Sequence, residues 1–565
     1  MIKKRINLIR SKFNEYGIDG YIIPKNDEFF SEYSNKDRLK TISNFTGSAG
    51  LAVILKTKNY LFVDGRYTIQ ANLESRSHFK IVSYEKIVNC KLFKNLTLGI
   101  DPKIFTSEQI KKYFAKNNKI KVINFNLVNL IFIKYTTKSK PFYSLSEKIT
   151  GQNHKIKINK IVKYLRQNNL DYLFISAPEN VAWLLNIRGY DNPNSPIPNC
   201  HLLINDKKKI FLIGKIKKFK KIIKEKKIEL KQIVDPENFK YFVSELRNGK
   251  ILLDSKSCSI FYENIFKKKF RIIKYDDPIY FLKSIKNNCE INHMINTHIW
   301  DGVALTKFLY WIKNINTKKI TEYEAQNKLE SFRKKNKNYL FPSFNTIAGS
   351  GKNGAIIHYR AEKKSAKKIK VNDIFLCDSG GQYKYGTTDV TRTICFSKPK
   401  NNIKNIFTRV LKGHIAVATA NLKKYYNGKL IDSIARKSLG KIGLDYQHGT
   451  GHGVGFFLNV HEGPQAISKF NQVKICEGMI LSNEPGYYKK NSFGIRIENL
   501  IYVKKIKNKL CFENLTLAPI DKDLINYNLL NKDEKNYLFK YHLNIYLKIS
   551  KFLNKNEKKW LGSLI

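Results

Sequence analysis

The chain has 565 residues, a net charge of +57, 42% hydrophobic residues and 13% aromatic residues. This length predicts three or four domains with a large buried interior, and the composition describes a globular protein. No apolar run reaches the roughly 18 residues of a membrane span, and the N-terminal segment lacks the uninterrupted apolar core of a signal peptide. We therefore expect a cytoplasmic protein with no membrane partner.

Neither the charge pattern nor the cysteines indicate a special class of protein. Lysine occurs with abundant asparagine and isoleucine along nearly the whole chain, which indicates a compositional drift and argues against a specific nucleic-acid partner. The densest basic run, 215–231, is predicted to be an amphipathic helix with a solvated lysine face. Its apolar positions are Ile216, Phe219, Ile222, Ile223 and Leu230. The eight cysteines form no CxxC pair, which argues against a disulfide framework or a thiolate zinc site.

Two successive segments, 1–145 and 146–285, show the same order of predicted elements. Each begins with apolar residues at helical spacing, continues with an apolar strand, and then has a hairpin, at 51–66 in the first and 201–214 in the second. The hairpins lie about 150 residues apart. We interpret this as an internal duplication of an αβ domain, with an irregular Pro- and Asn-rich loop at 189–199 in the second copy.

The remaining chain divides into a third segment, 286–510, and a tail, 511–565. The third segment opens with a long helical pattern, in which His293 and His298 belong to no motif and are expected to be surface or core residues. The tail is predicted to form one or two helices that pack on the third segment or on a second subunit. Its apolar stripe consists of Tyr537, Tyr541, Ile545 and Ile549.

Acidic residues and histidines gather on short, Gly-punctuated strands of the third segment. Asp378 ends an apolar run and Asp389 opens a β-branched run, with Gly380, Gly381 and Gly386 between them, which is typical of a hairpin. A turn midway would place the two aspartates opposite each other, where close carboxylates repel. A bound cation would remove that repulsion.

A second predicted hairpin joins 479–484 to 493–498 and brings Glu484 beside Glu498. Period-two alternation places Arg496 on the same strand face as Glu498, where its guanidinium can brace an acid. Thr391 likewise shares a face with a candidate ligand two residues away, so both are predicted to support ligands from behind. Cys377 is predicted to point to the opposite, apolar face.

His452 completes the set of candidate metal ligands. It lies in GTGHGVG, a Gly-rich turn that can bring an imidazole close to a ligand. Four carboxylates and one neutral imidazole carry a formal charge that two divalent cations balance, and oxygen-dominated ligation favours manganese over a thiolate-type zinc site. Taken singly, each residue has an ordinary structural interpretation, but their order along the chain indicates a dinuclear site. The candidate ligands are Asp378, Asp389, His452, Glu484 and Glu498.

At these motifs the chain resembles aminopeptidase P, the Xaa-Pro aminopeptidase branch of the metallopeptidases that share a fold with methionine aminopeptidase, prolidase and creatinase. The match runs from PSFNTIAGSGKNGAIIHYR at 342–360 through GIRIEN and into ENLTLAPI at 513–520. The resemblance implies an α/β (α+β) fold. Two related creatinase/prolidase N-terminal-type αβ domains would precede a pita-bread catalytic domain with a C-terminal helical extension.

The resemblance also implies roles for individual residues. The five candidate ligands match the family's metal ligands, with Asp389 and Glu498 expected to bridge two divalent ions, manganese being favoured and cobalt or zinc being alternatives. His358 in IIHYR, His448 in HGTGH and His461 in NVHEGP match the family's substrate-site histidines, which bind the substrate or stabilise the reacting carbonyl.

The expected reaction removes the N-terminal residue from peptides with proline in the second position. A water or hydroxide between the metals is the expected nucleophile, Glu484 the proton shuttle, and His358 and His461 the residues acting on the carbonyl. An Xaa-Pro bond is a tertiary amide without an N–H, so a site that grips the carbonyl and packs the ring provides a separate activity.

Two other functions remain open at this stage. A prolidase-type dipeptidase, or another N-terminal aminopeptidase of the same fold, would use the same ligands on a different peptide. A binding module that kept the fold and lost the metals is a different class, against which the five intact ligands argue. The resemblance further implies a homodimer, although two subunits at +57 each repel at long range.

Overall fold

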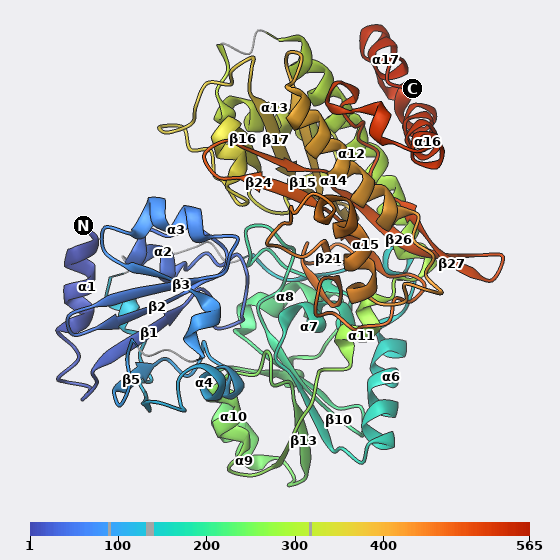
Figure 1. Ribbon diagram of the computed structural model, residues 1–565. Helices are drawn as coiled ribbons and strands as arrows, with labels where there is room; N and C mark the ends of the chain where they lie inside the picture. Colours follow the sequence, from blue (N-terminus) through green and yellow to red (C-terminus); the bar gives the residue numbers. More distant parts are fainter. Residues whose placement is uncertain (89–91, 132–139, 316–318) are drawn as a thin grey trace. The chain divides into compact units, whose positions relative to one another are not determined.

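The computed structural model describes residues 1–88, 92–131, 140–315 and 319–565. It divides into two compact units, Met1–Tyr280 and Phe281–Ile565 (Figure 1). Cys90 lies outside the described residues, and no disulfide joins cysteines within them. Within the described ranges, no helix combines the length and apolarity that crossing a bilayer would need.

Unit 1 contains two six-stranded sheets of the same topology. The first sheet contains β1 (Gly20–Pro24), β2 (Leu51–Leu55), β3 (Asn59–Val63), β4 (Lys80–Ser83), β5 (Thr97–Ile100) and β6 (Lys119–Val122). The second contains β8 (Tyr172–Ile175), β10 (His201–Asn205), β11 (Ile210–Ile213), β12 (Ile233–Val234), β13 (Lys250–Leu253) and β14 (Arg271–Lys274). The strand orders are β4-β3-β2-β1-β5-β6 and β12-β11-β10-β8-β13-β14. In both, the central strand pairs antiparallel on one side and parallel on the other, which confirms the duplication.

Alternation along the strands divides the first sheet between two cores. Tyr21 and Ile23 of β1 pack with the helices α1 (Ile2–Arg10), α2 (Arg38–Ser43) and α3 (Thr68–Ser75), whereas Ile22 packs with α4 (Ser107–Tyr113) on the other face. Both faces are therefore buried under helices, as the near-continuous apolar strands require.

The second sheet has its own helices, one of which is shorter than predicted. These are α6 (His154–Gln167), α7 (Pro178–Leu185), α8 (Ile216–Lys224), α9 (Phe239–Glu245) and α10 (Ile260–Phe266). The amphipathic helix predicted for 215–231 is only partly formed. Phe219 and Ile222 are buried on α8, but the chain leaves the helix at Lys226, which has a φ of 52°. Leu230 is consequently 59% exposed instead of lying on the apolar face.

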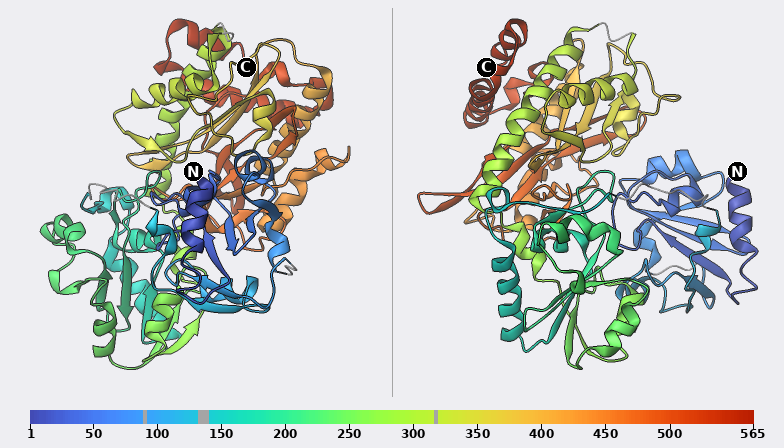
Figure 2. Two further views of the ribbon diagram at one scale, coloured as in Figure 1. Left: turned by 90° about the vertical axis from the view of Figure 1, so that its left-hand side faces the viewer. Right: turned by 180° about the vertical axis from the view of Figure 1, so that it is seen from behind.

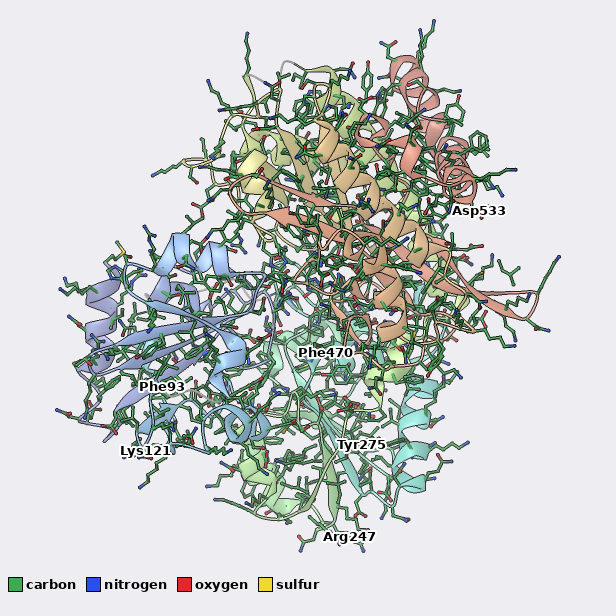
Figure 3. The ribbon with its side chains drawn as sticks, viewed as in Figure 1. Phe93, Lys121, Arg247, Tyr275, Phe470 and Asp533 are labelled. Atoms are coloured by element: carbon green, nitrogen blue, oxygen red, sulfur yellow. The ribbon has the colours of Figure 1, made fainter. Side chains whose placement is uncertain are left out.

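Basic side chains project outward around the rim of unit 1. Figure 3 shows Lys121 and Arg247 at its edge, far apart on different strands and loops of the two sheets.

Unit 2 is built from two helix pairs, each followed by strands. The helices are α12 (Asn288–Asn314), α13 (Glu322–Lys334), α14 (Asn401–Ala418) and α15 (Gly428–Gly440). The first set of strands is β15 (Tyr339–Pro342), β16 (Ile347–Ser350), β17 (Ile374–Ser379), β18 (Gly381–Tyr383), β19 (Gly386–Thr387) and β20 (Val390–Cys395). The second set is β21 (Gly451–Gly453), β22 (Glu462–Ile467), β23 (Ile480–Asn483), β24 (Gly486–Lys489), β25 (Phe493–Arg496), β26 (Asn499–Ile506) and β27 (Lys509–Asn514). Phe375 and Cys377 of β17 pack against α12 and α13, so Cys377 faces the apolar side as predicted.

The first acidic hairpin has a different register from the predicted one. Asp378 of β17 lies opposite Thr391 of β20, and Asp389 directly precedes β20 without a strand partner opposite Asp378. The prediction was wrong because the turn lies one residue later than expected: Tyr383 pairs with Gly386 across Lys384 and Tyr385, which moves the partner of Asp378 by two residues. The residues on either side of this turn form β18 and β19, which pair with each other, and β18 also pairs with β15 in a separate sheet.

The second acidic hairpin is longer than predicted. β24 pairs with β25 near the turn, and β23 pairs with β26 farther along, with Gly486 opposite Arg496 and Asn483 opposite Asn499. Glu484 and Glu498 fall at the interruption between these two ladders, so the predicted pairing of the two glutamates holds. Phe493, Ile495 and Ile497 point into the apolar core, as the alternation predicted.

The C-terminal tail packs on the rest of unit 2. Helices α16 (Lys532–Ile549) and α17 (Lys555–Gly562) lie beside α12 (Figure 2). Tyr541, Ile545 and Ile549 are buried in the same core as Ile495, so the predicted apolar stripe packs within the chain. His298 is buried, with its Nδ1 2.7 Å from the carbonyl oxygen of Met294, in agreement with its assignment to the core.

Candidate metal centre

The five candidate ligands converge from separate strands of unit 2. Asp378 lies on β17, Asp389 precedes β20, His452 lies on β21, and Glu484 and Glu498 flank the break between the two hairpin ladders. Together with His461 they form three overlapping groups, and within each group the ligand atoms lie within 4.8 Å of one another. The groups are Asp389, His452 and His461; His452, Glu484 and Glu498; and Asp378, Asp389 and Glu498.

His452 presents one defined nitrogen to this cluster. Its Nε2 lies 3.4 Å from Asp389 Oδ2 and 3.6 Å from Glu484 Oε1. Its Nδ1 lies 2.9 Å from the carbonyl oxygen of Gly453, which can only accept a hydrogen bond, so Nδ1 carries the proton. Nε2 is thus the nitrogen available for coordination, because a carbonyl at Nδ1 fixes the tautomer that a metal-bound histidine needs.

The crowding of carboxylates perturbs their ionisation. Burial raises the pKa of Asp378 to about 7, with Asp389 and Glu484 adding to the rise and Arg496 opposing it. Burial and the same neighbouring acids raise the pKa of Glu498 well above its usual range. Burial lowers the pKa of His452, but Asp389 and Glu484 outweigh it and raise that pKa to about 9. The cluster therefore attracts positive charge, which divalent cations would supply.

One buried oxygen supports the same conclusion. Asp378 Oδ2 accepts a hydrogen bond from Arg496, but Asp378 Oδ1 is buried and has no hydrogen-bond partner among the described residues. An unpartnered carboxylate oxygen in a buried site is costly unless something else binds it. The donor set, four carboxylates and one imidazole, fits two hard or borderline divalent ions.

Arg496 and Thr391 hold the carboxylates in a continuous hydrogen-bond chain. Arg496 donates to Asp378 Oδ2 at 2.6 Å and, through Nε, to Thr391 Oγ1 at 2.9 Å. The Thr391 hydroxyl in turn donates to Glu498 Oε2 at 2.7 Å. Both residues thus orient predicted ligands from behind, where loss of a partner typically weakens metal binding.

Two neighbours of the cluster were missed by the sequence analysis. The Tyr488 hydroxyl accepts a bond from Arg496 at 2.6 Å and lies 2.9 Å from Nε2 of His448. The Ser482 hydroxyl donates to Glu484 Oε1 at 3.1 Å and accepts from the backbone N–H of His452 at 2.9 Å. Both lie an even number of residues from Glu484, so strand alternation extended from that glutamate would have found them.

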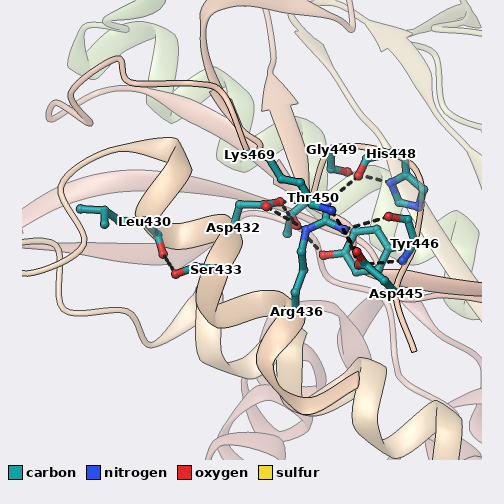
Figure 4. A network of polar contacts seen from close by, with 10 residues as sticks. All are labelled: Leu430, Asp432, Ser433, Arg436, Asp445, Tyr446, His448, Gly449, Thr450 and Lys469. Carbon is teal, nitrogen blue, oxygen red and sulfur yellow. Dashed lines mark hydrogen bonds and ion pairs between the residues drawn. The ribbon is translucent and has the colours of Figure 1, made fainter. Parts of the chain in front are cut away.

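The loop that carries His448 is held by an ion pair on α15 (Figure 4). Arg436 pairs with Asp432 at 2.8 Å and donates to the carbonyl oxygen of His448 at 2.7 Å. Asp432 also accepts a bond from the Thr450 hydroxyl at 2.6 Å, and the carbonyl of Thr450 accepts from the backbone N–H of Glu484 at 2.8 Å. This network joins the position of His448 to that of a predicted ligand.

The three histidines predicted to contact substrate have different surroundings in the structure. The ring of His461 is exposed and lies 4.4 Å from the ring of His452, so it stands at the open side of the cluster. His448 contacts Tyr488, as described above. His358 is half-buried and, among the described residues, belongs to none of the three ligand groups.

The loop of His358 is nevertheless tied to the strand of Arg496. It follows the short helix η5 (Gly351–Ala355), which packs on β25. A Cβ at Gly494 would lie 1.8 Å from the carbonyl oxygen of Gly354, so only glycine allows this close approach.

Comparisons with known families account for nearly the whole chain. Residues 5–129 and 134–290 each match a creatinase/prolidase N-terminal domain. Residues 292–505 match metallopeptidase family M24, and residues 508–563 match the C-terminal region of that family.

The similar proteins are also full-length matches. The chain is 34% identical to a probable Xaa-Pro aminopeptidase P from Laccaria bicolor, covering 99% of this chain and 92% of the relative. It is 34% identical to Xaa-Pro aminopeptidase 1 from Dictyostelium discoideum, covering 100% and 96%. The crystal structure of an X-prolyl aminopeptidase from Caenorhabditis elegans, described as a cytosolic enzyme with a di-nuclear active site, matches with a TM-score of 0.92 at 28% identity, covering 100% and 99%.

The fold and the acidic cluster together define a metallopeptidase of the M24 type. Its two N-terminal domains, its C-terminal region and its full-length relatives narrow this further: the chain belongs to the Xaa-Pro aminopeptidase P family, whose members are metallo-aminopeptidases. A prolidase from Pyrococcus furiosus shares less of the chain, with a TM-score of 0.51 at 27% identity over 63% of this chain and 98% of its own.

Proposed function

We propose that this chain releases the N-terminal residue from peptides with proline in the second position, using two divalent ions held by its acidic cluster. The observation that carries the proposal is the convergence of the five predicted ligands, from separate strands and strand ends, in three overlapping groups of three residues that also include His461. Asp389 and Glu498 would bridge the ions, and Asp378, His452 and Glu484 would complete the ligand set. Manganese suits these ligands best, with cobalt or zinc as alternatives.

The reaction needs a proton acceptor near the attacking water, and Glu484 suits this role. When bound, the two cations lower the pKa of water and polarise the substrate carbonyl. Glu484 is held by the Ser482 hydroxyl through one oxygen and is only partly buried. It can therefore take a proton and later deliver one to the departing proline nitrogen, as general acid-base catalysis requires.

The histidines suit roles on the substrate. His461 stands exposed beside the cluster, where its ring can donate to the scissile carbonyl oxygen. His448, held by Tyr488 and by the ion pair on α15, is positioned to bind substrate, and His358 acts from its own loop. Hydrogen bonds from these histidines would hold the carbonyl of the Xaa-Pro bond, which has no N–H of its own.

Peptide hydrolysis distinguishes this activity from the dipeptidase alternative. We expect Ala-Pro-Yaa tripeptides to be cleaved after alanine, Ala-Ala-Yaa tripeptides at a rate at least about 100-fold lower, and Ala-Pro dipeptides poorly. The products are separated and quantified by mass spectrometry. Equal cleavage of Ala-Ala-Yaa and Ala-Pro-Yaa would refute the proline specificity, and preference for the dipeptide would favour a prolidase-type enzyme.

We further propose a cytoplasmic location, in line with the cytosolic C. elegans relative, and a division of the chain at residues 145, 285 and 510 into four parts. Peptides are the expected partners, with no specific nucleic acid and no membrane. A binding module without metals is disfavoured, because the buried carboxylates would then repel one another with nothing to offset them.

We also propose a homodimer that uses the outer face of α16. The tail's predicted stripe is buried within the chain and is unavailable for this purpose, but Phe539 and Leu547 are 49% and 69% exposed, with the partly exposed Leu543 between them. This spacing forms a second apolar stripe on one helix face. The dimer is expected to tighten as salt screens the charge repulsion.

Light scattering across a salt series tests this assembly. We expect a mass of twice 65.9 kDa, approached at lower protein concentration as ionic strength rises. Leu547→Lys should shift the protein toward monomer, whereas Lys548→Ala, one residue away, should not. A particle of 65.9 kDa at every ionic strength and at high protein concentration would contradict the proposal.

A further inference from the structure

The buried guanidinium of Arg392 lies directly behind the predicted bridging ligand Glu498. Arg392 follows Thr391 on β20 and is 3% exposed. Its NH1 donates to the carbonyl oxygen of Glu498 at 2.7 Å, and its NH2 donates to Asn499 Oδ1 at 2.8 Å. The backbone N–H of Glu498 meanwhile donates to the carbonyl oxygen of Thr391 at 3.2 Å. Both backbone polar groups of Glu498 are thus fixed by β20.

The other side of the same guanidinium belongs to the C-terminal segment. NH2 donates to the carbonyl oxygen of Ala518 at 2.6 Å and to the Tyr541 hydroxyl at 2.8 Å, while Nε donates to the carbonyl oxygen of Pro519 at 3.0 Å. The Tyr541 hydroxyl itself donates to Ala518 at 2.8 Å. A buried side chain from α16 therefore closes the hydrogen-bond set of an arginine that holds Glu498.

The acceptors around Arg392 are neutral oxygens, so the direction of its planar fork depends on all of them. NH2 has two N–H bonds for three acceptors, Asn499 Oδ1, Ala518 O and the Tyr541 hydroxyl, so loss of that hydroxyl redistributes its two protons over the remaining acceptors and lets the fork turn. Any such turn also moves the bond to the Glu498 carbonyl, because one rigid group makes both contacts. The Glu498 carboxylate belongs to the same residue as that carbonyl, so a shift of the backbone also changes the direction of the carboxylate.

We propose that Tyr541 is a positioning residue for the metal centre: its hydroxyl fixes the Arg392 fork, which fixes the backbone of Glu498 and aims that carboxylate into the ligand cluster. The C-terminal segment is then part of the metal-binding machinery and not only a cover for the apolar core. This inference rests on the proposed function, in which Glu498 is a metal ligand.

The isosteric variant Tyr541→Phe tests the inference, because it removes the hydroxyl and leaves the apolar packing of the ring. We expect manganese, titrated into metal-stripped protein, to bind about 10-fold more weakly, with kcat lowered by a similar factor and KM nearly unchanged. The thermal midpoint of the metal-free protein is measured in parallel.

Tyr537→Phe is the matched control. Tyr537 lies one turn away on α16, its ring is stacked on Tyr541 with a centroid distance of 6.3 Å, and its hydroxyl accepts a bond from Asn514 at 2.9 Å instead of from Arg392. We expect this variant to lose thermal stability comparably but to keep the manganese affinity and kcat of the unmodified protein. Equal loss of affinity in both variants, or a loss of stability alone in Tyr541→Phe, would overturn the inference.

A double-mutant cycle with Arg392→Lys identifies the route. Lysine keeps the charge but loses the fork, so the effect of Tyr541→Phe on manganese affinity should largely disappear in that background. Full additivity of the two changes would overturn the route through Arg392. Absence of manganese, cobalt and zinc binding by the unmodified protein would overturn the proposed function as well, whereas normal binding with an unaffected Tyr541→Phe variant would overturn this inference alone.

Discussion

Replacing Asp389 or Glu498 by alanine is expected to abolish peptide hydrolysis, with a loss well beyond the roughly 100-fold that removal of an outer hydrogen-bond partner costs. Asp389 and Glu498 each belong to two of the three groups of converging ligand atoms. Either change is therefore expected to remove a ligand from both predicted metal positions. Elemental analysis after reconstitution should show fewer than two ions per chain.

Thermal stability separates this loss from unfolding. The carboxylates repel one another in the absence of cations, so the metal-free variants should be as stable as the metal-free parent protein or more stable. Asp276→Ala is the control, because Asp276 is an exposed acid paired with Lys256 at the surface of unit 1. Full activity and two bound ions in the Asp389 or Glu498 variant would refute the dinuclear assignment.

His461→Ala is expected to lower kcat by about 100-fold or more while leaving both ions bound. The ring is exposed and stands at the open side of the cluster, so its loss removes a donor to the substrate without opening the core. His358→Ala should behave in the same way, with turnover reduced more than metal content.

His452→Ala is expected to give the opposite result, although the rings of His452 and His461 are only 4.4 Å apart. That variant should lose metal and activity together, because Nε2 of His452 faces Asp389 and Glu484. If His461→Ala also released a metal ion, His461 would be a ligand and the division of roles between the two histidines would be wrong.

The duplication and the candidate ligands were accessible from sequence because they depend on local patterns. Successive side chains of strands such as β1 and β8 point to opposite faces, and this alternation can be followed without knowledge of distant contacts. The same alternation placed Arg496 beside Glu498 and Cys377 on the apolar face. The roles of the individual ligands and histidines stay predictions until they are measured.

Features that depend on distant segments were not accessible in the same way. Asp378 pairs opposite Thr391 and not Asp389, because the turn lies at Lys384 and Tyr385, next to β18, which pairs with the distant strand β15. The Arg436 network joins α15 to the His448 loop, and neither segment alone signals the other. Arg392 is a similar case, since its acceptors come from β26, from Ala518 and Pro519, and from α16.

The most direct measurement of the central claim is hydrolysis of Ala-Pro-Yaa by metal-stripped protein to which single divalent ions are returned. We predict that the stripped protein is inactive, that manganese restores the highest rate, and that activity saturates at two ions per chain. Full hydrolysis by the stripped protein, or saturation at one ion, would contradict a dinuclear metallo-aminopeptidase.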